Sequence, residues 1–541
     1  MARASSPCKA RSGWPCHEFA SVGKMKHCIV TFEPEGRQVT VHKGANLVEA
    51  AGIAGIVLNT LCGQKGSCGK CSVIIQPQGK SVLACQYNVT SDITVLVPRE
   101  SRFVENKILT EGVSRPDAVS PDIYKKYLSF AGDRPILGLA IDVGTTTIVV
   151  KLIDMKSAKV LSTTADLNPQ AKFGDDVISR IAYAQNDEKL ARLNKLLIGR
   201  LDNLIADCCA ASGIKRDDIY EACIVGNTTM NHIFLRLPLT QLGQAPYKAF
   251  SLDARDISPQ DSGLVINPKG NIRAVANIAG FVGADTTAVA LATGLDSAQE
   301  VTLAIDIGTN GEVVLGTKDK LLAASCAAGP AFEGARITCG SRAVDGAIEA
   351  VVVDNGNIDF DVIGGRSPVS ICGSGLIDAV AVLLDLGVID STGRFIRYLE
   401  SIAAGGPPAF VLARDSKGKP CVYLTQKDVR EVQLAKAAIR AGIRLLQKRL
   451  SVADADIKKI YLAGAFGNYI RPQSALRIGL LPDVPVDRIQ SVGNAASSGA
   501  QMALVSSHWR KLACDLAKKI QYVEIANDPD FQSVFPDSMS F

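Results

Sequence analysis

An internal repeat is the feature that most constrains how this chain folds. Residues 139–150 (LAIDVGTTTIVV) and 303–314 (LAIDIGTNGEVV) are identical at eight of twelve positions and lie 164 residues apart. Each copy is an apolar strand ending in Asp, then Gly and Thr, and strand-like runs alternate with helical stretches around both. A repeat at this spacing predicts two related α/β lobes, over residues 136–300 and 301–541.

Each Asp-x-Gly-Thr turn has the chemistry of a phosphate site. Glycine allows a sharp turn, after which backbone N–H groups and Thr hydroxyls can surround a phosphate. Asp142 and Asp306 can hold a hydrated Mg²⁺, which prefers one or two carboxylates. One such turn is weak evidence, but two can face each other and bind one nucleotide from both sides. A purely structural duplication is the alternative.

Further segments that follow apolar runs extend this predicted nucleotide site. They are residues 226–229, 283–286 and 462–467, and an ordinary turn at a strand end is the alternative for each. No Gly-x-Gly-x-x-Gly stands at a strand–helix junction, which disfavours a dinucleotide or flavin site. The predicted nucleotide contacts are Gly144, Thr145, Thr146, Asn227, Thr228, Asp285, Gly308, Thr309, Asn310, Gly464, Ala465, Phe466 and Gly467.

Four cysteines predict a metal centre near the start of the chain. Cys62, Cys68, Cys71 and Cys85 fall within 24 residues, with glycines between the first three. Thiolates suit iron–sulfur clusters or zinc, and glycine lets the backbone wrap closely around a cluster. Zinc ribbons usually bring two short Cys pairs, whereas three ligands here share one loop. We therefore predict a [2Fe–2S] cluster, with zinc or reduced structural thiols as alternatives.

The cysteine loop lies within a predicted small domain. Alternating strands at 26–33 and 38–42, a helix at 45–53 and strands at 72–76 and 92–97 predict an α+β domain of the β-grasp kind over residues 25–98. Residues 99–135 contain several prolines and charges and predict a linker. Residues 1–24 are basic but lack the apolar core of a signal peptide, so we expect a disordered tail.

Composition excludes several classes of function. Lys and Arg total 59 against 54 Asp and Glu, a net charge of +5, which does not indicate nucleic-acid binding. The longest apolar region, residues 274–295, contains Asp285 and is no bilayer span. Fifteen cysteines, an odd number, argue against a secreted disulfide scaffold. We expect a cytoplasmic protein.

Two resemblances follow from these motifs. The cysteine domain resembles [2Fe–2S] ferredoxins, and the lobes resemble the acetate kinase, sugar kinase, Hsp70 and actin (ASKHA) superfamily, with RNase H-like lobes. The whole chain resembles the reductive activators of corrinoid proteins. That resemblance rests on NPQAKFGDDV (168–177), GNTTM (226–230), AGPAFEGA (328–335), ICGSGLID (371–378) and GAFGNY (464–469).

The corrinoid-activator resemblance implies a function. Such a protein uses ATP and Mg²⁺ to reduce inactive Co(II) to Co(I) on a corrinoid protein of a methyltransferase system, as in anaerobic O-demethylation. It implies an external low-potential electron donor and allows a homodimer. A plant-type [2Fe–2S] centre lies near −400 mV, and each 100 mV uphill costs about 2.3 kcal/mol per electron. A nucleotide-driven step can offset a gap of that order.

The cobalt is expected on the partner and not on this chain. None of the five histidines has the Asp-x-His-x-x-Gly flanks of a corrinoid carrier. Within the small-residue loop 325–334, Ser325 is the candidate for reaching the cobalt, with a strand-end hydroxyl bonded to backbone as its alternative.

Three other functions stay open at the level of sequence. One is an ATP-driven electron donor for another low-potential enzyme, such as a dehydratase. The second is a small-molecule kinase with a redox sensor, although no sequence for its catalytic carboxylate base is evident. The third is an Hsp70-like binding module whose nucleotide cycle responds to clients.

Overall fold

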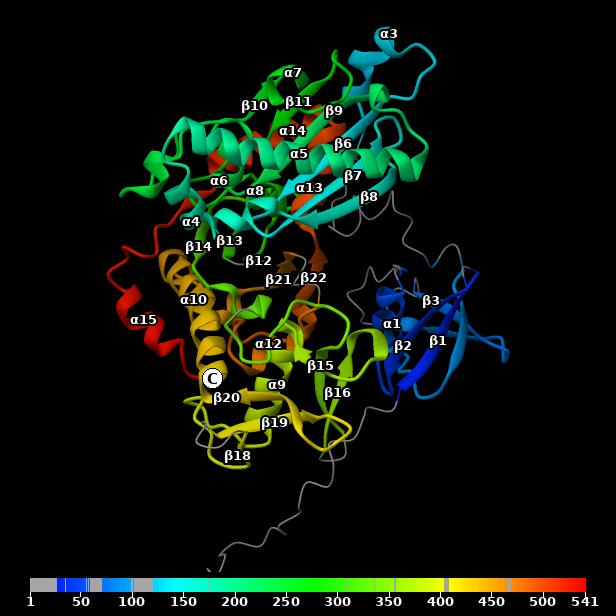
Figure 1. Ribbon diagram of the computed structural model, residues 1–541, viewed down its shortest axis with the longest axis vertical. Coiled ribbons are helices and arrows are strands. Elements are labelled where there is room, and N and C mark those ends of the chain that lie inside the picture. Colours follow the sequence, from blue (N-terminus) through cyan, green and yellow to red (C-terminus); the bar gives the residue numbers. More distant parts are fainter. Residues whose placement is uncertain are drawn as a thin grey trace, which may run out of the picture.

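The computed structural model describes most of the chain. The described residues are 27–34, 36–54, 56, 58, 71–98, 101, 120–174, 176–308, 310–334, 336–354, 357–402, 408–464 and 469–541. The tail predicted over residues 1–24 and most of the expected linker lie outside them. Figure 1 shows a small domain beside two stacked lobes.

The small domain is a mixed five-stranded sheet in the order β2-β1-β5-β3-β4. β1 and β5 are parallel neighbours, as in a β-grasp sheet, and the buried side chains of the strands pack with α1 into a core of their own. The edge strand β4 was not predicted. The elements are β1 (His27–Glu33), β2 (Arg37–His42), α1 (Leu47–Ile53), β3 (Ser72–Gln76), β4 (Lys80–Leu83) and β5 (Ile93–Leu96).

Lobe 1 is built on a six-stranded sheet in the order β10-β11-β9-β6-β7-β8. β6 and β9 lie at its centre and are almost wholly buried, which explains their nearly continuous apolar sequence. Its strands are β6 (Leu137–Val143), β7 (Thr147–Asp154), β8 (Val160–Leu167), β9 (Ile219–Gly226), β10 (Arg255–Ile257) and β11 (Asn271–Ala274). Its main helices are α4 (Val177–Tyr183), α5 (Asp187–Ser212), α6 (Thr228–Phe234) and α8 (Ala284–Ala292), with the short α7 (Pro259–Ser262).

Lobe 2 repeats the same topology. Its sheet has the order β22-β21-β12-β13-β14-β23, so β14-β13-β12-β21-β22 matches β8-β7-β6-β9-β11 strand for strand. Antiparallel pairing within the first three strands and parallel pairing of the fourth are also shared. The strands are β12 (Thr302–Ile307), β13 (Gly311–Gly316), β14 (Leu321–Cys326), β21 (Lys459–Ala463), β22 (Ile489–Gly493) and β23 (Gln521–Tyr522). The predicted RNase H-like duplication of the lobes is confirmed.

Two small sheets and several helices complete lobe 2. One sheet contains β15 (Ala347–Asp354), β16 (Asn357–Val362) and β17 (Ser370–Ile371), with β16 at its edge. The other contains β18 (Glu400–Ser401), β19 (Pro408–Arg414) and β20 (Pro420–Thr425). The helices are α9 (Gly373–Asp385), α10 (Gln426–Leu450), α12 (Pro472–Arg477) and α15 (Phe531–Asp537).

Two C-terminal helices cross back to lobe 1. α13 (Ala495–Val505) follows β22 but packs against β6, β9 and α8, and α14 (Ser507–Lys519) packs beside it. At the crossing of α13 and α8, a Cβ on Gly499 would lie 2.2 Å from the Ala288 carbonyl oxygen, so only glycine allows this approach. A division at residue 300 therefore separates the sheets but not these helices.

Part of the segment expected to be a linker is packed on lobe 1. It contains a 3₁₀ turn (Ile123–Tyr127) and α3 (Leu128–Ala131). The buried carboxylate of Glu221 on β9 accepts a hydrogen bond from the Tyr127 hydroxyl and pairs with Lys126 at 2.8 Å and Arg510 of α14 at 3.0 Å. One buried acid thus ties this segment and a C-terminal helix to the sheet.

Candidate functional site

The first Asp-x-Gly-Thr turn lies at the end of β6, where the central strand leaves the sheet. Asp142 is the only acidic side chain of β6, and Gly144 donates its N–H to the Thr147 carbonyl at 2.9 Å. A Cβ on Gly144 would lie 2.7 Å from that same oxygen, which explains the glycine. Asn227, the N-cap of α6, donates to the Thr145 hydroxyl at 2.9 Å, so two predicted segments meet at this turn.

The 168–177 motif supports the same turn from behind. Asn168 donates its side-chain N–H to the Gly144 carbonyl at 2.9 Å and its backbone N–H to the Thr146 carbonyl at 2.8 Å. Arg180 of α4 is fully buried and donates to the Thr145 carbonyl at 2.6 Å. These bonds hold the turn by its carbonyl groups. Sequence reasoning named the motif but not this role.

The second turn lies at the end of β12 and meets β21. Gly464, at φ +90°, sits directly against Asp306, since a Cβ there would lie 2.5 Å from the Asp306 carboxylate oxygen. Gly308 donates its N–H to the Asn310 carbonyl at 3.0 Å. The predicted residues Thr309, Ala465, Phe466 and Gly467 lie outside the described residues.

Four carboxyl groups gather where the two turns meet. We call Asp142, Asp285, Asp306 and Glu312 the acidic cluster; each is partly accessible. Burial raises the pKa of Asp142 to about 6, although a hydrogen bond from Asn494 opposes the rise. Burial and the neighbouring Asp142 raise the pKa of Asp285 to about 7, and burial with Asp285 and Asp142 raises that of Asp306 to about 7. Burial and like charge also raise the pKa of Glu312 well above its usual range.

Two members of this arrangement were missed by sequence reasoning. Glu312 lies opposite Asp306 in the pairing of β12 with β13, and the signal was a charged residue inside the apolar second repeat. Asn494 donates to the Asp142 carboxylate at 2.8 Å and caps α13 through its side-chain oxygen. Its signal was a Gly-Asn pair after a strand, as in Gly226-Asn227.

The acidic cluster suits a magnesium ion that a nucleotide brings with it. Hard carboxylate oxygens are the ligands that Mg²⁺ prefers, and it usually keeps several waters and takes only one or two carboxylates. Among the described residues, no three His, Cys, Asp or Glu side chains are placed to hold a metal ion together. A hydrated ion completed by nucleotide phosphates needs no more than one or two of the carboxylates of the acidic cluster.

Two predicted residues have other contacts in the structure. Thr228 is fully buried and donates its hydroxyl to the Ala279 carbonyl at 2.6 Å, so its hydroxyl supports a turn; its contact with a nucleotide stays a prediction. Ser325 on β14 is half-buried and lies opposite Glu312, to which its hydroxyl donates at 3.4 Å. Its predicted contact with cobalt stays a prediction.

The small domain brings two of the four predicted cluster ligands together. The sulfurs of Cys71 and Cys85 are 3.3 Å apart and buried, and they form no disulfide. Two thiolates about 2.3 Å from one tetrahedral metal would be about 3.8 Å apart, so the pair fits a shared metal after a small adjustment. Cys62 and Cys68 lie outside the described residues.

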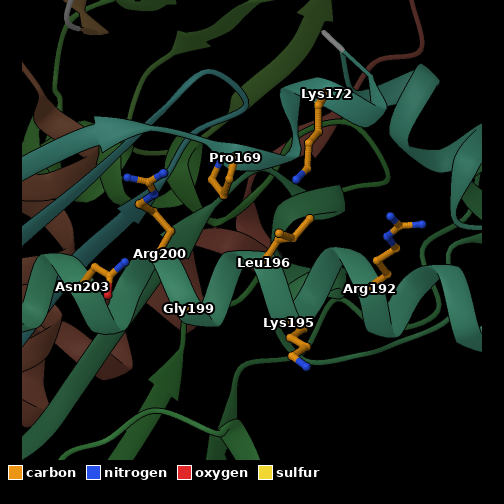
Figure 2. Close-up of a pocket in the computed structure, with 8 residues that line it drawn as sticks. All are labelled: Pro169, Lys172, Arg192, Lys195, Leu196, Gly199, Arg200 and Asn203. Carbon is orange, nitrogen blue, oxygen red and sulfur yellow. The ribbon is translucent and has the colours of Figure 1, made fainter.

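A separate cavity of about 720 Å³ lies on the outer side of α5 and contains none of the predicted nucleotide residues. Figure 2 shows its basic lining. Arg200 pairs with Asp166, while Arg192 and Lys172 lie 5.0 and 5.4 Å from the centre of the Phe173 ring. These contacts engage the cations within the chain, and we assign the cavity no role. Its lining residues are Pro169, Lys172, Arg192, Lys195, Leu196, Gly199, Arg200 and Asn203.

The fold and the site together define a class: an ASKHA ATPase that carries a [2Fe–2S] ferredoxin domain. Known families match each part of the chain. Residues 28–97 match the "2Fe-2S iron-sulfur cluster binding domain", 137–298 the "RACo middle region" and 300–541 the "C-terminal domain of RACo the ASKHA domain". No helix in the described part of the chain is long and apolar enough to cross a membrane.

Individual relatives align with three quarters or more of the chain. The corrinoid activation enzyme RamQ of Eubacterium limosum is 35% identical, over 92% of this chain and 96% of the relative. A reductase of the Co(II) methylated amine-specific corrinoid protein from Methanosarcina barkeri is 24% identical, over 75% and 77%. The solved reductive activator for corrinoid, iron–sulfur protein matches with a TM-score of 0.71 and 32% identity, over 95% and 98%. The chain belongs to the family of reductive activators of corrinoid proteins.

Proposed function

We propose that this chain uses ATP to drive one electron onto the Co(II) of a corrinoid held by a separate methyl-transfer protein, regenerating Co(I). The observation that carries the proposal is the union, in one chain, of a buried ferredoxin thiol pair and a duplicated Asp turn converging on an acidic cluster. Relatives named for corrinoid activation, which align over nearly the full length, support the choice of substrate.

We assign the following roles to the residues of the acidic cluster and the turns. Asp142 and Asp306 hold the waters of Mg²⁺, and Asp285 adds negative charge beside them. The backbone N–H groups of Thr145 and Thr146 bind phosphate, and Asn168 and Arg180 hold this turn by its carbonyls. The predicted residues Gly308, Asn310 and Gly464 form the opposing surface of the nucleotide site.

In the small domain, Cys62, Cys68, Cys71 and Cys85 hold the cluster. When bound, the [2Fe–2S] group supplies the single electron that converts Co(II) to Co(I). An external low-potential donor restores that electron, and the hydrolysis of ATP to ADP and phosphate resets the two lobes. A reducing cytoplasm is the compartment that suits these thiolates, and a homodimer is compatible with the fold.

The proposal is tested by asking what stimulates ATP hydrolysis. Anaerobically purified protein is expected to contain about two irons and two sulfides per chain. Its ATP hydrolysis should rise when a Co(II) corrinoid protein is added, and not when the methylated form of the same protein is added. Stoichiometric zinc in place of iron would remove the electron-transfer role. Equal stimulation by unfolded proteins would favour an Hsp70-like module instead.

A further inference from the structure

Two of the five histidines of the chain lie side by side on the ferredoxin domain. His27 on β1 and His42 on β2 are directly opposite in the antiparallel pairing of these strands. Directly paired residues point to the same face of a sheet. Both imidazoles therefore lie on the same face of the sheet, at its β2 edge.

Both histidines contact a single carboxylate of lobe 2. Asp361 on β16 binds His27 Nε2 through one oxygen, and its other oxygen lies 3.1 Å from His42 Nδ1. The side chains are largely withdrawn from solvent, with 33%, 17% and 15% of His27, His42 and Asp361 exposed. The carboxylate of Asp361 thus links the two edge strands β2 and β16, and Figure 1 shows the small domain beside this part of lobe 2.

The surroundings of this contact are rich in acid. The charge of Glu49 of α1 raises the pKa of His42 and of Glu349 on β15. The charge of Asp361 also raises the pKa of Glu349. Asp359 lies on the same face of β16 as Asp361. Arg471 is the cation that acts on His42 from lobe 2, and it is already paired with Asp378 at 2.9 Å. Like charges that face each other across an interface disfavour contact, so the positive charge of a protonated His42 balances the acids here.

We propose that the face of lobe 2 around Asp361 is a docking surface for the chain's own ferredoxin domain, bound through His27 and a protonated His42 and released when His42 loses its proton. The domain can then leave lobe 2 to bring its cluster to another position. This inference goes beyond the proposed function, since it needs only that the ferredoxin domain moves as a unit.

The pKa shifts agree with this linkage. The hydrogen bond to Asp361 raises the pKa of His42, against burial, which lowers it. Burial works to raise the pKa of Asp361, but hydrogen bonds from His42 and His27 outweigh it and leave the pKa below its usual range. The contribution of His42 to docking is therefore complete below about pH 6.5 and is lost as pH rises through its raised value.

The test measures hydrogen exchange of the full-length chain in peptides covering β2 and β16. After correction for the chemical rate, exchange should be slow at about pH 6 and rise at least about tenfold by about pH 9, since each released proton shifts the equilibrium up to tenfold per pH unit. In the Asp361→Asn variant these peptides should exchange rapidly already at about pH 6. The His42→Gln variant, which changes the other domain, should behave in the same way. Small-angle scattering should show a larger radius of gyration in every released state.

Matched controls separate the contact of His27 and His42 with Asp361 from general effects of charge. Asp359→Asn removes an acid from the same face of β16, and His508→Gln removes a histidine that meets the Trp509 ring edge-on in α14. Both should follow the wild type. Slow exchange in Asp361→Asn and His42→Gln at about pH 6 would overturn the proposal, as would a wild-type profile that does not change with pH. Because no corrinoid is used, these outcomes do not depend on the proposed function.

Discussion

Asp142 and Asp306 occupy the same position in the two copies of the repeat, yet their surroundings differ. Asp142 accepts a hydrogen bond from Asn494, and its pKa rises only to about 6. In the described part of the chain, no side chain donates a hydrogen bond to Asp306. Glu312 lies opposite Asp306, and the pKa of Asp306 rises to about 7. The two copies thus share the turn but give its aspartate different roles: a hydrogen bond holds Asp142 in place, and a second acid faces Asp306.

The largest expected effect comes from neutralising each aspartate in turn. Asp306→Asn should reduce ATP hydrolysis about 1000-fold or more, because it removes charge that only a bound cation would balance. Asp142→Asn should cost less, about 30-fold, since Asn494 can still orient the amide. Steady-state hydrolysis assays at saturating Mg²⁺ measure both, with the exposed Asp319→Asn as control. Equal losses in the two variants would contradict the division of roles.

The second prediction concerns pH. Because the pKa values of Asp285 and Asp306 lie at about 7, both carboxyls are largely protonated at about pH 6 and must lose protons to receive Mg²⁺. For each proton that Mg²⁺ must displace, the affinity for Mg²⁺-ATP should therefore fall up to tenfold per pH unit below about pH 7. Titration calorimetry between about pH 5.5 and 8 measures this. A flat profile would show that these carboxyls do not receive the cation.

A third prediction isolates the anchor of lobe 1. Asn494→Ala removes both the hydrogen bond to Asp142 and the cap of α13, and should cost about 1–2 kcal/mol of stability and about tenfold in ATP hydrolysis. Ser498→Ala, which removes only a hydroxyl that donates to the Asn494 carbonyl, is the matched control. The pKa of Asp142 should rise in Asn494→Ala. The acidic limb of the pH profile of ATP hydrolysis should therefore move to higher pH. An unchanged acid limb would show that the hydrogen bond does not tune Asp142.

The smallest effect is on the stability of the nucleotide-free protein. A carboxyl whose pKa is raised by folding holds its proton in the folded state while the unfolded chain has lost it. Stability therefore falls as pH rises from about 4 to about 7. Asp306→Asn should flatten this fall and raise the melting temperature at about pH 7 by about 2–4 °C for each kcal/mol gained. A lower melting temperature for Asp306→Asn would mean that the like charges around Asp306 do not strain the folded state.

The sequence was sufficient where local pattern decides structure. The repeat predicted two like sheets, and the alternation of residues 26–42 predicted β1 and β2. Contacts between distant segments were not predictable in this way. Asn494 meets Asp142 across 352 residues, because α13 crosses back to lobe 1, and nothing in its own neighbourhood signals that path.

Buried polar side chains were the other limit of the sequence. Thr228 has the residue type and position of a phosphate ligand, yet the packing of α6 turns its hydroxyl toward a carbonyl. Arg180 resembles a surface helix residue and is instead fully buried under the first turn. Pattern gives the face of a strand or helix, but only packing determines which polar groups face each other across it.

The central claim is that ATP drives the cluster's electron uphill onto cobalt, and a single-turnover absorbance measurement tests it most directly. Protein with a reduced cluster, freed of excess reductant, is mixed with a Co(II) corrinoid protein with and without Mg²⁺-ATP. We expect close to one Co(I) per reduced cluster with ATP, return of the visible absorbance of the oxidised cluster in step, and no Co(I) from Asp306→Asn. Equal Co(I) formation without ATP, or with protein lacking iron, would contradict the account.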